Sequence, residues 1–302
     1  MLIVAALGGN ALLRRGEMLT ADVQRRNVRR ACEALAKLVK AGHQLVVTHG
    51  NGPQVGLLAL QGAAYRPEGA DPLDVLGAET EGMIGYMIEQ ELENAIGHQQ
   101  PVATLLTQVV VDPEDPAFQN PTKFVGPVYG QEEAERKADA DGWVISKDGD
   151  KWRRVVASPF PLEIPDISVI RLLLNHEVIV ICAGGGGIPV IQLKNGSLLG
   201  VEAVIDKDAV SALLAEQLHA DALLLLTDVD GVYRDFGTPA AERLTILSSE
   251  DIDITSLPAG SMKPKVIAAG RFSSTGGIAG IGRLEDALDI LQGKAGTSVI
   301  GK

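Results

Sequence analysis

One run of residues constrains the fold more than any other part of this chain. Residues 178–182 are apolar and rich in β-branched side chains, and four consecutive glycines follow at Gly184 to Gly187. An unbroken apolar run of this kind is typical of a strand buried on both faces, as in a parallel sheet covered by helices. The sequence therefore predicts a buried strand that leads into a loop without side chains.

The four glycines favour a ligand at that loop. Without side chains, their backbone N–H groups can approach an anion such as phosphate closely. A tight turn is the alternative, but one or two glycines would be enough for it. Three other apolar runs, at residues 2–7, 44–49 and 222–226, also lead into glycine or small polar residues. Because ligands bind beyond the carboxyl ends of the strands in an open α/β sheet, these loops predict one shared anion site.

The rest of the chain alternates between helical and strand patterns. Thr20 is the predicted N-cap of a helix that continues to about residue 41, and Asp71 is the predicted N-cap of a longer helix that continues to about residue 95. Residues 102–111 are expected to form one further strand. We therefore predict an α/β fold with a mostly parallel sheet, in a single domain that comprises residues 1–302.

Residues 113–165 interrupt this alternation. They are rich in proline, glycine and charge, and a charged helix near residues 131–141 is the main regular element expected there. A structureless loop of that length is improbable inside a compact domain, so we expect a small inserted lobe that could fold over the site. The alternative is a surface excursion without a role.

Composition and charge argue against several kinds of partner. The formal net charge is −12 and there is no long basic run, which argues against nucleic acid and anionic membrane surfaces. No apolar run reaches the roughly 18 residues of a membrane span, and the first basic residues follow the N-terminal apolar run, the wrong order for a signal peptide. Cys32 and Cys182 form no disulfide framework and no zinc-site spacing. We expect a cytoplasmic protein.

Three lysines stand where they could serve an anion. Lys123 lies in the inserted segment, Lys207 stands between two aspartates at a predicted helix start, and Lys265 follows a proline at another. A single lysine is far more often a solvated surface charge. Phosphoryl transfer, however, needs several cations and N–H groups around the transferred group, together with Mg²⁺. The chain lacks the P-loop pattern and the spacing of a dinucleotide-binding loop.

Eight segments of the chain resemble the carbamate kinase family of the amino acid kinase superfamily. They occur in order over nearly the whole chain: ALGGNA (6–11), THGNGPQVG (48–56), LTQVVVD (106–112), NPTKFVGP (120–127), RRVVASP (153–159), CAGGGGIPV (182–190), EAVIDKD (202–208) and GSMKPK (260–265). The resemblance implies a three-layer αβα sandwich with a protruding subdomain, and a homodimer. It implies reversible phosphoryl transfer from carbamoyl phosphate to ADP with Mg²⁺, giving carbamate and ATP, in arginine or purine/allantoin catabolism.

The same resemblance implies roles for individual residues. Those implied to act in catalysis are Gly8, Gly9, Asn10, Lys123, Lys207, Asp208 and Lys265, with Asp208 holding the lysines. Those implied to hold the carbamoyl end are Gly50, Asn51, Gly52 and Lys123. Those implied to bind the nucleotide are Gly185, Gly186, Lys207, Thr227, Asp228, Tyr233, Met262 and Lys265. No protein ligand to a metal is implied, since Mg²⁺ would be carried by ATP or ADP.

One residue departs from the family pattern. The family segment usually reads Gln-Gly-x-Ile-Gly-Tyr, whereas the segment at residues 81–86 begins with Glu81. A carboxylate near the substrate would repel an anion, and a purely structural one would have no such effect. Two alternatives stay open: a kinase of the same superfamily that acts on another acyl phosphate, and a non-catalytic nucleotide-binding regulator. The full set of charges that the chain retains argues against the regulator.

Overall fold

A mostly parallel sheet forms the centre of the molecule. The computed structural model describes residues 1–14, 16–65, 71–248, 257 and 262–301. The sheet has eight strands in the order β15-β17-β16-β12-β1-β2-β9-β3. They are β1 (Leu2–Leu7), β2 (Gln44–His49), β3 (Val102–Thr104), β9 (Ile179–Ile181), β12 (Ala222–Thr227), β15 (Ile246–Ser248), β16 (Ile278–Arg283) and β17 (Thr297–Ile300). Every neighbouring pair is parallel except β16 and β17, which confirms the predicted type of sheet.

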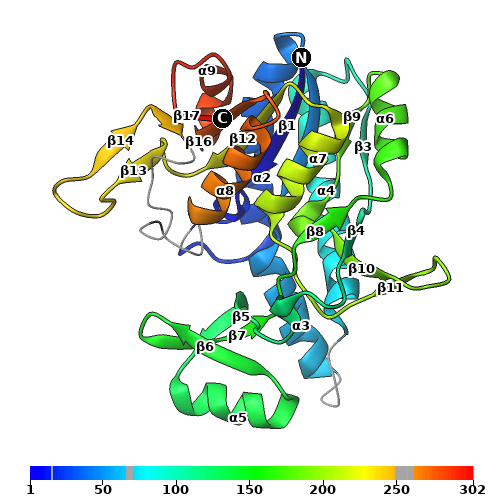
Figure 1. Cartoon of the computed structure of the whole chain (residues 1–302), viewed down its shortest axis with the longest axis vertical. Coiled ribbons are helices and arrows are strands. Elements are labelled where there is room, and N and C mark those ends of the chain that lie inside the picture. The colour runs from blue at the N-terminus through cyan, green and yellow to red at the C-terminus, as the bar shows by residue number, and fades with distance from the viewer. Residues whose placement is uncertain (15, 66–70, 249–256, 258–261, 302) are drawn as a thin grey trace.

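Helices cover both faces of this sheet (Figure 1). One face packs against α2 (Ala21–Lys40), α4 (Leu73–Ile96) and α9 (Ala287–Leu291), and the other against α6 (Ile167–Asn175), α7 (Lys207–Leu218) and α8 (Met262–Ser273). Side chains of β1 alternate between the two cores: Ile3 belongs to the first and Val4 to the second, as the strand period requires. The three-layer αβα sandwich is confirmed. No helix in the described part of the chain is both long and apolar enough to cross a membrane.

The beginnings of the two long helices show how local sequence sets their ends. Thr20 caps α2, and its Oγ1 accepts a hydrogen bond from the backbone N of Val23 at 3.3 Å, as predicted. Helix α4 begins at Leu73 with Pro72 at the N-cap, so the prediction of Asp71 as N-cap is wrong by one residue. The carboxylate of Glu202 supplies the missing cap, since it accepts a hydrogen bond from the backbone N of Leu73 at 2.8 Å.

The single strand predicted at residues 102–111 is wrong. The chain forms β3 and then β4 (Gln108–Val111), and these belong to different sheets. The reason is that the backbone N of Thr107 donates to the carboxylate of Glu81 at 3.1 Å, not to a neighbouring strand. β4 joins a second sheet of order β11-β10-β4-β8. The other strands of that sheet are β8 (Pro161–Glu163), β10 (Ile188–Gln192) and β11 (Leu198–Gly200).

Part of the segment at residues 113–165 forms a lobe that projects below the main body in Figure 1. It consists of β5 (Lys123–Tyr129), α5 (Gln131–Asp141), β6 (Val144–Asp148) and β7 (Lys151–Val156), with an antiparallel sheet of order β5-β7-β6. The other two elements of the segment are η1 (Pro116–Phe118) and β8, and β8 pairs with β4 of the main body. The lobe itself therefore comprises residues 123–156.

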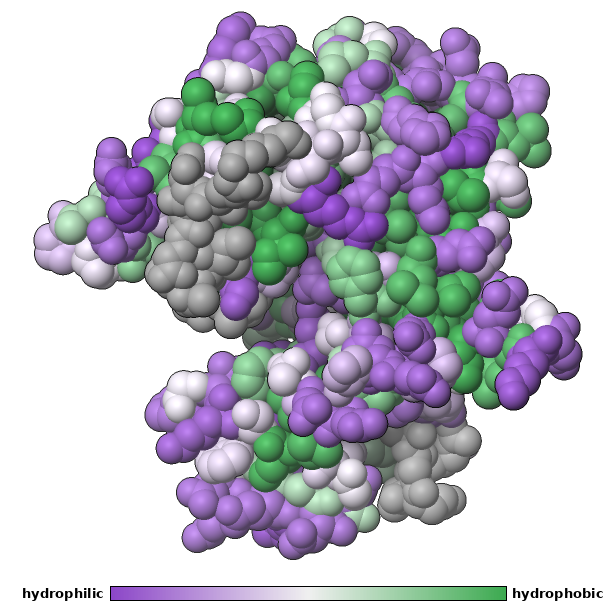
Figure 2. Space-filling view, viewed as in Figure 1, coloured by the Kyte–Doolittle hydropathy of each residue, from purple (hydrophilic) through white to green (hydrophobic). Residues whose placement is uncertain are grey.

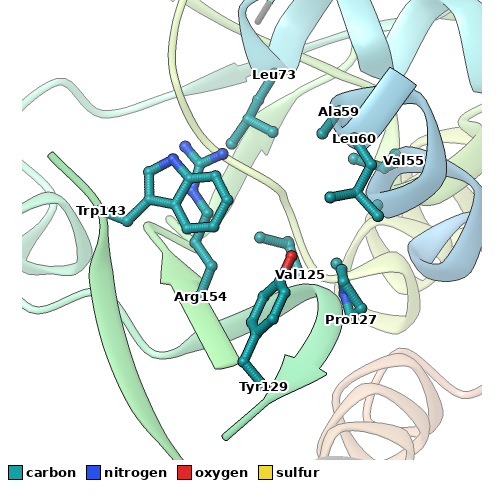
Figure 3. A pocket seen from close by; sticks show the side chains of 11 residues that line it. Val55, Ala59, Leu60, Leu73, Val125, Pro127, Tyr129, Trp143 and Arg154 are labelled. Carbon is teal, nitrogen blue, oxygen red and sulfur yellow. The ribbon is translucent and has the colours of Figure 1, made fainter. Parts of the chain in front are cut away.

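The lobe rests on α3 (Gly52–Tyr65) through apolar contacts (Figure 3). The backbones approach closely at Gly56 and Gly126, where a Cβ on Gly56 would collide with Gly126. Beside this contact is a narrow cavity of about 20 Å³. Its lining residues, seen in Figure 3, are Val55, Ala59, Leu60 and Leu73 on the main body and Val125, Pro127, Tyr129, Trp143 and Arg154 on the lobe.

The remaining elements are short. They are α1 (Gly9–Leu12), η2 (Gly184–Gly186), β13 (Val232–Arg234), β14 (Glu242–Leu244) and η4 (Leu284–Asp286). Three of them, α1, η2 and β13, follow the strands β1, β9 and β12 at their carboxyl ends, where the predicted site would lie.

Candidate active site

A cleft of about 480 Å³ lies between the main body and the lobe, at the carboxyl edge of the central sheet. The loops after β1, β2, β9 and β12 form one wall, and the lobe contributes β5 and β7. Figure 2 shows the hollow between the two parts of the molecule. The structure thus brings the predicted strand-end loops to one place, as expected for an open α/β sheet.

Two lysines share one buried carboxylate in this cleft. Oδ1 of Asp208 accepts from Nζ of Lys207 at 2.6 Å, and Oδ2 accepts from Nζ of Lys265 at 2.9 Å. Burial by itself would raise the pKa of Asp208, but the two ammonium groups outweigh it and hold that pKa well below the usual range. The group carries two positive charges and one negative, so it attracts an anion from within a largely negative protein.

A second carboxylate links the lobe to the main body. Asp206 caps α7, and its Oδ1 accepts from the backbone N of Asp208 at 2.9 Å. Its Oδ2 accepts from Nζ of Lys123, the first residue of β5, at 2.7 Å. Asp206 therefore places the lobe's lysine beside Lys207. Sequence reasoning missed Asp206 as a site residue, although its place before Lys207 at a helix start was the available signal.

The loops after β1 and β2 meet at the floor of the cleft. Gly8 and Gly9 line it together with Gly50, Asn51 and Gly52. A Cβ on Gly50 would lie 3.1 Å from the backbone N of Gly9, so any larger residue would push the two loops apart by a few tenths of an ångström.

The side chain of Asn10 lies outside the described part of the chain. Among the lining residues that sequence reasoning missed is Arg153, which comes from β7 of the lobe and donates from Nε to the backbone O of Gly126 at 2.7 Å.

The four-glycine loop lies mostly beneath the cleft. Gly185 lines the cleft, whereas Gly186 packs against the backbone O of Ile205. Gly185 has φ +68°, and the space that its Cβ would fill is occupied by the carboxamide of Asn51. The glycines thus let neighbouring side chains and backbone pack closely. Of the two glycines of this loop that were predicted to bind the nucleotide, only Gly185 lines the cleft.

A smaller pocket of about 80 Å³ adjoins the cleft. It is lined by Thr227, Asp228, Val229, Gly231, Tyr233, Phe236, Leu257, Met262 and Lys265, of which Thr227, Asp228 and Lys265 also line the cleft. The rings of Tyr233 and Phe236 meet edge to face with centroids 5.7 Å apart. An apolar, aromatic pocket beside a cationic cleft suits a ligand with a flat ring at one end and negative charge at the other.

Glu81 does not line the cleft. It is only 1% exposed, and its carboxylate accepts hydrogen bonds from the backbone N of Gly184 at 2.7 Å and of Thr107 at 3.1 Å. Burial raises the pKa of Glu81 to about 8, although these two hydrogen bonds oppose the shift. Among the described residues, no group of three or more His, Cys, Asp or Glu side chains is placed to hold a metal ion.

Known proteins share this architecture. The model of the amino acid kinase family matches residues 1–281. Carbamate kinases of Rhizobium meliloti (strain 1021) and Haemophilus influenzae are 56% and 57% identical to the chain, over 99% and 100% of its length and 93% and 97% of theirs. The solved structure of carbamate kinase from Giardia lamblia bound to AMP-PNP matches with a TM-score of 0.89 and 41% identity, over 100% of this chain and 98% of that one. The chain belongs to the carbamate kinases of the amino acid kinase family.

Proposed function

We propose that this chain catalyses reversible phosphoryl transfer between carbamoyl phosphate and ADP, giving carbamate and ATP. The observation that carries the proposal is the buried group of Lys207, Lys265 and Asp208, which lines the cleft next to the pocket around Tyr233. The identity to carbamate kinases over the whole chain supports the choice of substrate.

In the direction of ATP formation, a β-phosphate oxygen of ADP attacks the phosphorus of carbamoyl phosphate. The bond from phosphorus to the carbamoyl oxygen breaks, and carbamate leaves as an anion. Neither reacting oxygen has a proton to lose, so the site needs no general base. Its task is to align the two substrates and to stabilise the charge that spreads over the transferred phosphoryl oxygens, which Lys207 and Lys265 can do.

The geometry also suggests how the two substrates are arranged. The adenine would occupy the pocket lined by Tyr233 and Met262, with the phosphates directed toward Lys265, which borders both spaces. The carbamoyl end would lie against the loop formed by Gly50, Asn51 and Gly52, with Lys123 above it. This arrangement places the transferred group between the two substrates, beside Gly8 and Gly9.

We propose that Mg²⁺ enters with the nucleotide. The carboxylates of Asp206 and Asp208 are both engaged by lysines, so the phosphate oxygens would supply most of the metal ligands. Bound there, the metal would neutralise charge on the phosphates.

Two further proposals concern assembly and location. We propose a homodimer, because apolar side chains of Met83, Tyr86 and Leu106 are exposed on the α4 side of the molecule, where a Cβ on Gly82 would contact Leu106. Sedimentation analysis tests this, and a single species of 31.8 kDa would reject it. We also propose a cytoplasmic location, to which the buried free thiols of Cys32 and Cys182 are suited.

The deciding experiment measures ATP formed from carbamoyl phosphate and ADP with the purified chain, with and without Mg²⁺. A reaction without protein corrects for spontaneous breakdown of carbamoyl phosphate. We expect Mg²⁺-dependent ATP formation. ATP formed only from another acyl phosphate would assign the chain to a different substrate, and nucleotide binding without any turnover would indicate a regulator.

A further inference from the structure

Two adjacent residues of α4 hold two different loops of the cleft. Oγ1 of Thr80 accepts a hydrogen bond from Nδ2 of Asn51 at 2.9 Å. Oε1 of Glu81 accepts one from the backbone N of Gly184 at 2.7 Å. Both side chains are buried. Helix α4 therefore sets the position of the loop after β2 and of the loop after β9 at the same time.

These two loops are also packed directly against each other. The carboxamide of Asn51 fills the space in which a Cβ of Gly185 would stand, and the ring of His49 does the same at Gly184. The loops are in close contact at both points, so a shift of Gly184 that carries its neighbour Gly185 along would displace Asn51. The position of Asn51 at the cleft floor thus depends on Glu81 as well as on Thr80.

The carboxylate of Glu81 uses both of its oxygens. Oε2 accepts from the backbone N of Thr107, and Oγ1 of Thr107 in turn accepts from the backbone N of Ala183 at 3.0 Å. A glutamine at this position would have the same shape but only one acceptor oxygen. Its NH₂ group would face an N–H donor, which would leave one buried N–H without a partner.

We propose that Glu81 in its ionised form, together with Thr80, positions Asn51 at the carbamoyl end of the cleft. The inference rests on the proposed function. Neither residue lines the cleft, so both act through the loops and not on the substrate. The carboxylate therefore fixes the geometry of the carbamoyl end indirectly, and its charge is met by the backbone N–H groups of Thr107 and Gly184.

The charges around Glu81 make this role depend on pH. Asp166, at the N-cap of α6, is another carboxylate and raises the pKa of Glu81, although burial raises it more. His49 is neutral, because burial lowers its pKa to about 4, and burial also raises the pKa of the Cys182 thiol. In the described part of the chain, no cation offsets Glu81. With a pKa of about 8, the group becomes ionised, and the positioning tightens, as the pH rises toward and past that value.

The test is steady-state kinetics of ATP formation by the wild-type chain and the variants Glu81→Gln, Thr80→Val and Thr80→Ser. We expect Glu81→Gln to raise the KM for carbamoyl phosphate about tenfold and to leave the KM for ADP unchanged, since the loop that packs against Asn51 loses one of the two hydrogen bonds to the charged carboxylate. The increase of kcat/KM for carbamoyl phosphate with pH around 8 should disappear in this variant. Thr80→Val should raise the same KM, and Thr80→Ser, which keeps the hydroxyl, should restore it.

A merely structural role for Glu81 predicts a different result. It would lower the melting temperature of Glu81→Gln without separating the two KM values or changing the pH profile, and that outcome would overturn the inference. The Thr80 pair provides a second test if Glu81→Gln does not fold, because equal KM values in Thr80→Val and Thr80→Ser would also reject the inference. An inactive wild-type chain would instead reject the proposed function, and the positioning role with it.

Discussion

The Nζ atom of Lys123 lies 2.7 Å from Oδ2 of Asp206, so one ion pair connects the projecting lobe to the N-cap of α7. The next residues of that helix, Lys207 and Asp208, belong to the buried charge group. Both side chains of the connecting pair are partly exposed, at 34% and 26%. A pair of this kind contributes about 1 kcal/mol or less to stability, so its importance lies in where it places the Lys123 ammonium.

Replacing Lys123 by alanine should therefore affect activity far more than stability. We expect kcat/KM for carbamoyl phosphate to fall about tenfold or more, because a charge-assisted contact to the substrate is lost. The melting temperature should change by only about 2–4 °C or less. The matched control is Asp206→Asn, which keeps an N-cap for α7 but loses the charge. Unchanged kcat/KM in Lys123→Ala would exclude a role of Lys123 in the reaction.

Variants of Lys207 and Asp208 should have different main effects: the Lys207 variant should lose catalysis, and the Asp208 variant should lose stability. Lys207→Met should lower kcat by about 10²–10³, by analogy with the loss of a single donor to a transition state, while the chain stays folded. Asp208→Asn should lower the free energy of unfolding by about 3–5 kcal/mol, because two buried ammonium groups lose their counter-charge. Kinetics and urea unfolding of both variants check this. Near-normal turnover in Lys207→Met would remove that lysine from the mechanism.

Low pH should weaken the stabilising contribution of Asp208 in the buried charge group. Because the folded state holds the pKa of Asp208 below its ordinary value of 3.8, its stabilising contribution is complete above that pH and is lost as the pH falls below it. The free energy of unfolding of the wild-type chain should therefore decline more steeply below about pH 4 than that of Asp208→Asn. Equal acid slopes in the two chains would contradict the lowered pKa.

The amino-acid sequence predicts the sheet and its ligand edge well, for a physical reason. Strands buried on both faces appear as continuous apolar runs, and the loops at their carboxyl ends must be small or polar to admit a ligand. The runs before Gly8, Gly50 and Gly184 have this pattern, so the strands and their common edge could be placed from local residues alone.

Positions that depend on distant contacts could not be predicted. A glutamate in the middle of a helix is normally solvated, and only the folded chain shows that Glu81 meets the N–H groups of Thr107 and Gly184. The same contact divides residues 102–111 into two strands, which an apolar pattern does not record. The link between Asp206 and Lys123 likewise depends on how the lobe is seated.

The pocket around Tyr233 should affect the affinity for the nucleotide and not the affinity for carbamoyl phosphate. We expect Tyr233→Ala to raise the KM for ADP about tenfold by loss of ring contacts and to leave the KM for carbamoyl phosphate unchanged. Tyr233→Phe keeps the ring and loses only the hydrogen bond from Oη to Oδ1 of Asp230, so it should behave nearly as the wild type. If Tyr233→Ala raised both KM values equally, the pocket would not be specific to the nucleotide.

His49 and Glu81 should give stability opposite dependences on pH. Burial lowers the pKa of His49 from 6.5 to about 4, so in that window the unfolded chain binds a proton that the folded chain does not, and stability falls as the pH falls. Burial raises the pKa of Glu81 from 4.5 to about 8, so the folded chain binds the extra proton and stability falls as the pH rises.

The two effects oppose each other between pH 4.5 and 6.5, and variants should reveal each one. In Glu81→Gln, the free energy of unfolding should fall more steeply on acidification than in the wild type, by up to about 1.4 kcal/mol per pH unit. In His49→Gln it should fall instead as the pH rises. Urea unfolding at three pH values in this window measures both slopes. Parallel curves for the three chains would show that neither group titrates there.

The packing of Asn51 over Gly185 can be tested against a glycine elsewhere in the chain that has nearly the same positive φ. Gly185 and Gly149 have φ of +68° and +67°, so alanine at either position takes on a left-handed φ, which costs roughly 1 kcal/mol. A Cβ at Gly149, in the turn between β6 and β7, meets nothing within 4 Å, whereas at Gly185 it would displace the Asn51 carboxamide.

We therefore expect Gly149→Ala to lower stability slightly and to keep full activity. Gly185→Ala should lower stability further and should raise the KM for carbamoyl phosphate, because Asn51 no longer fits its place. If the two variants were equally active, the contact between the glycine loop and Asn51 would not set the geometry of the site.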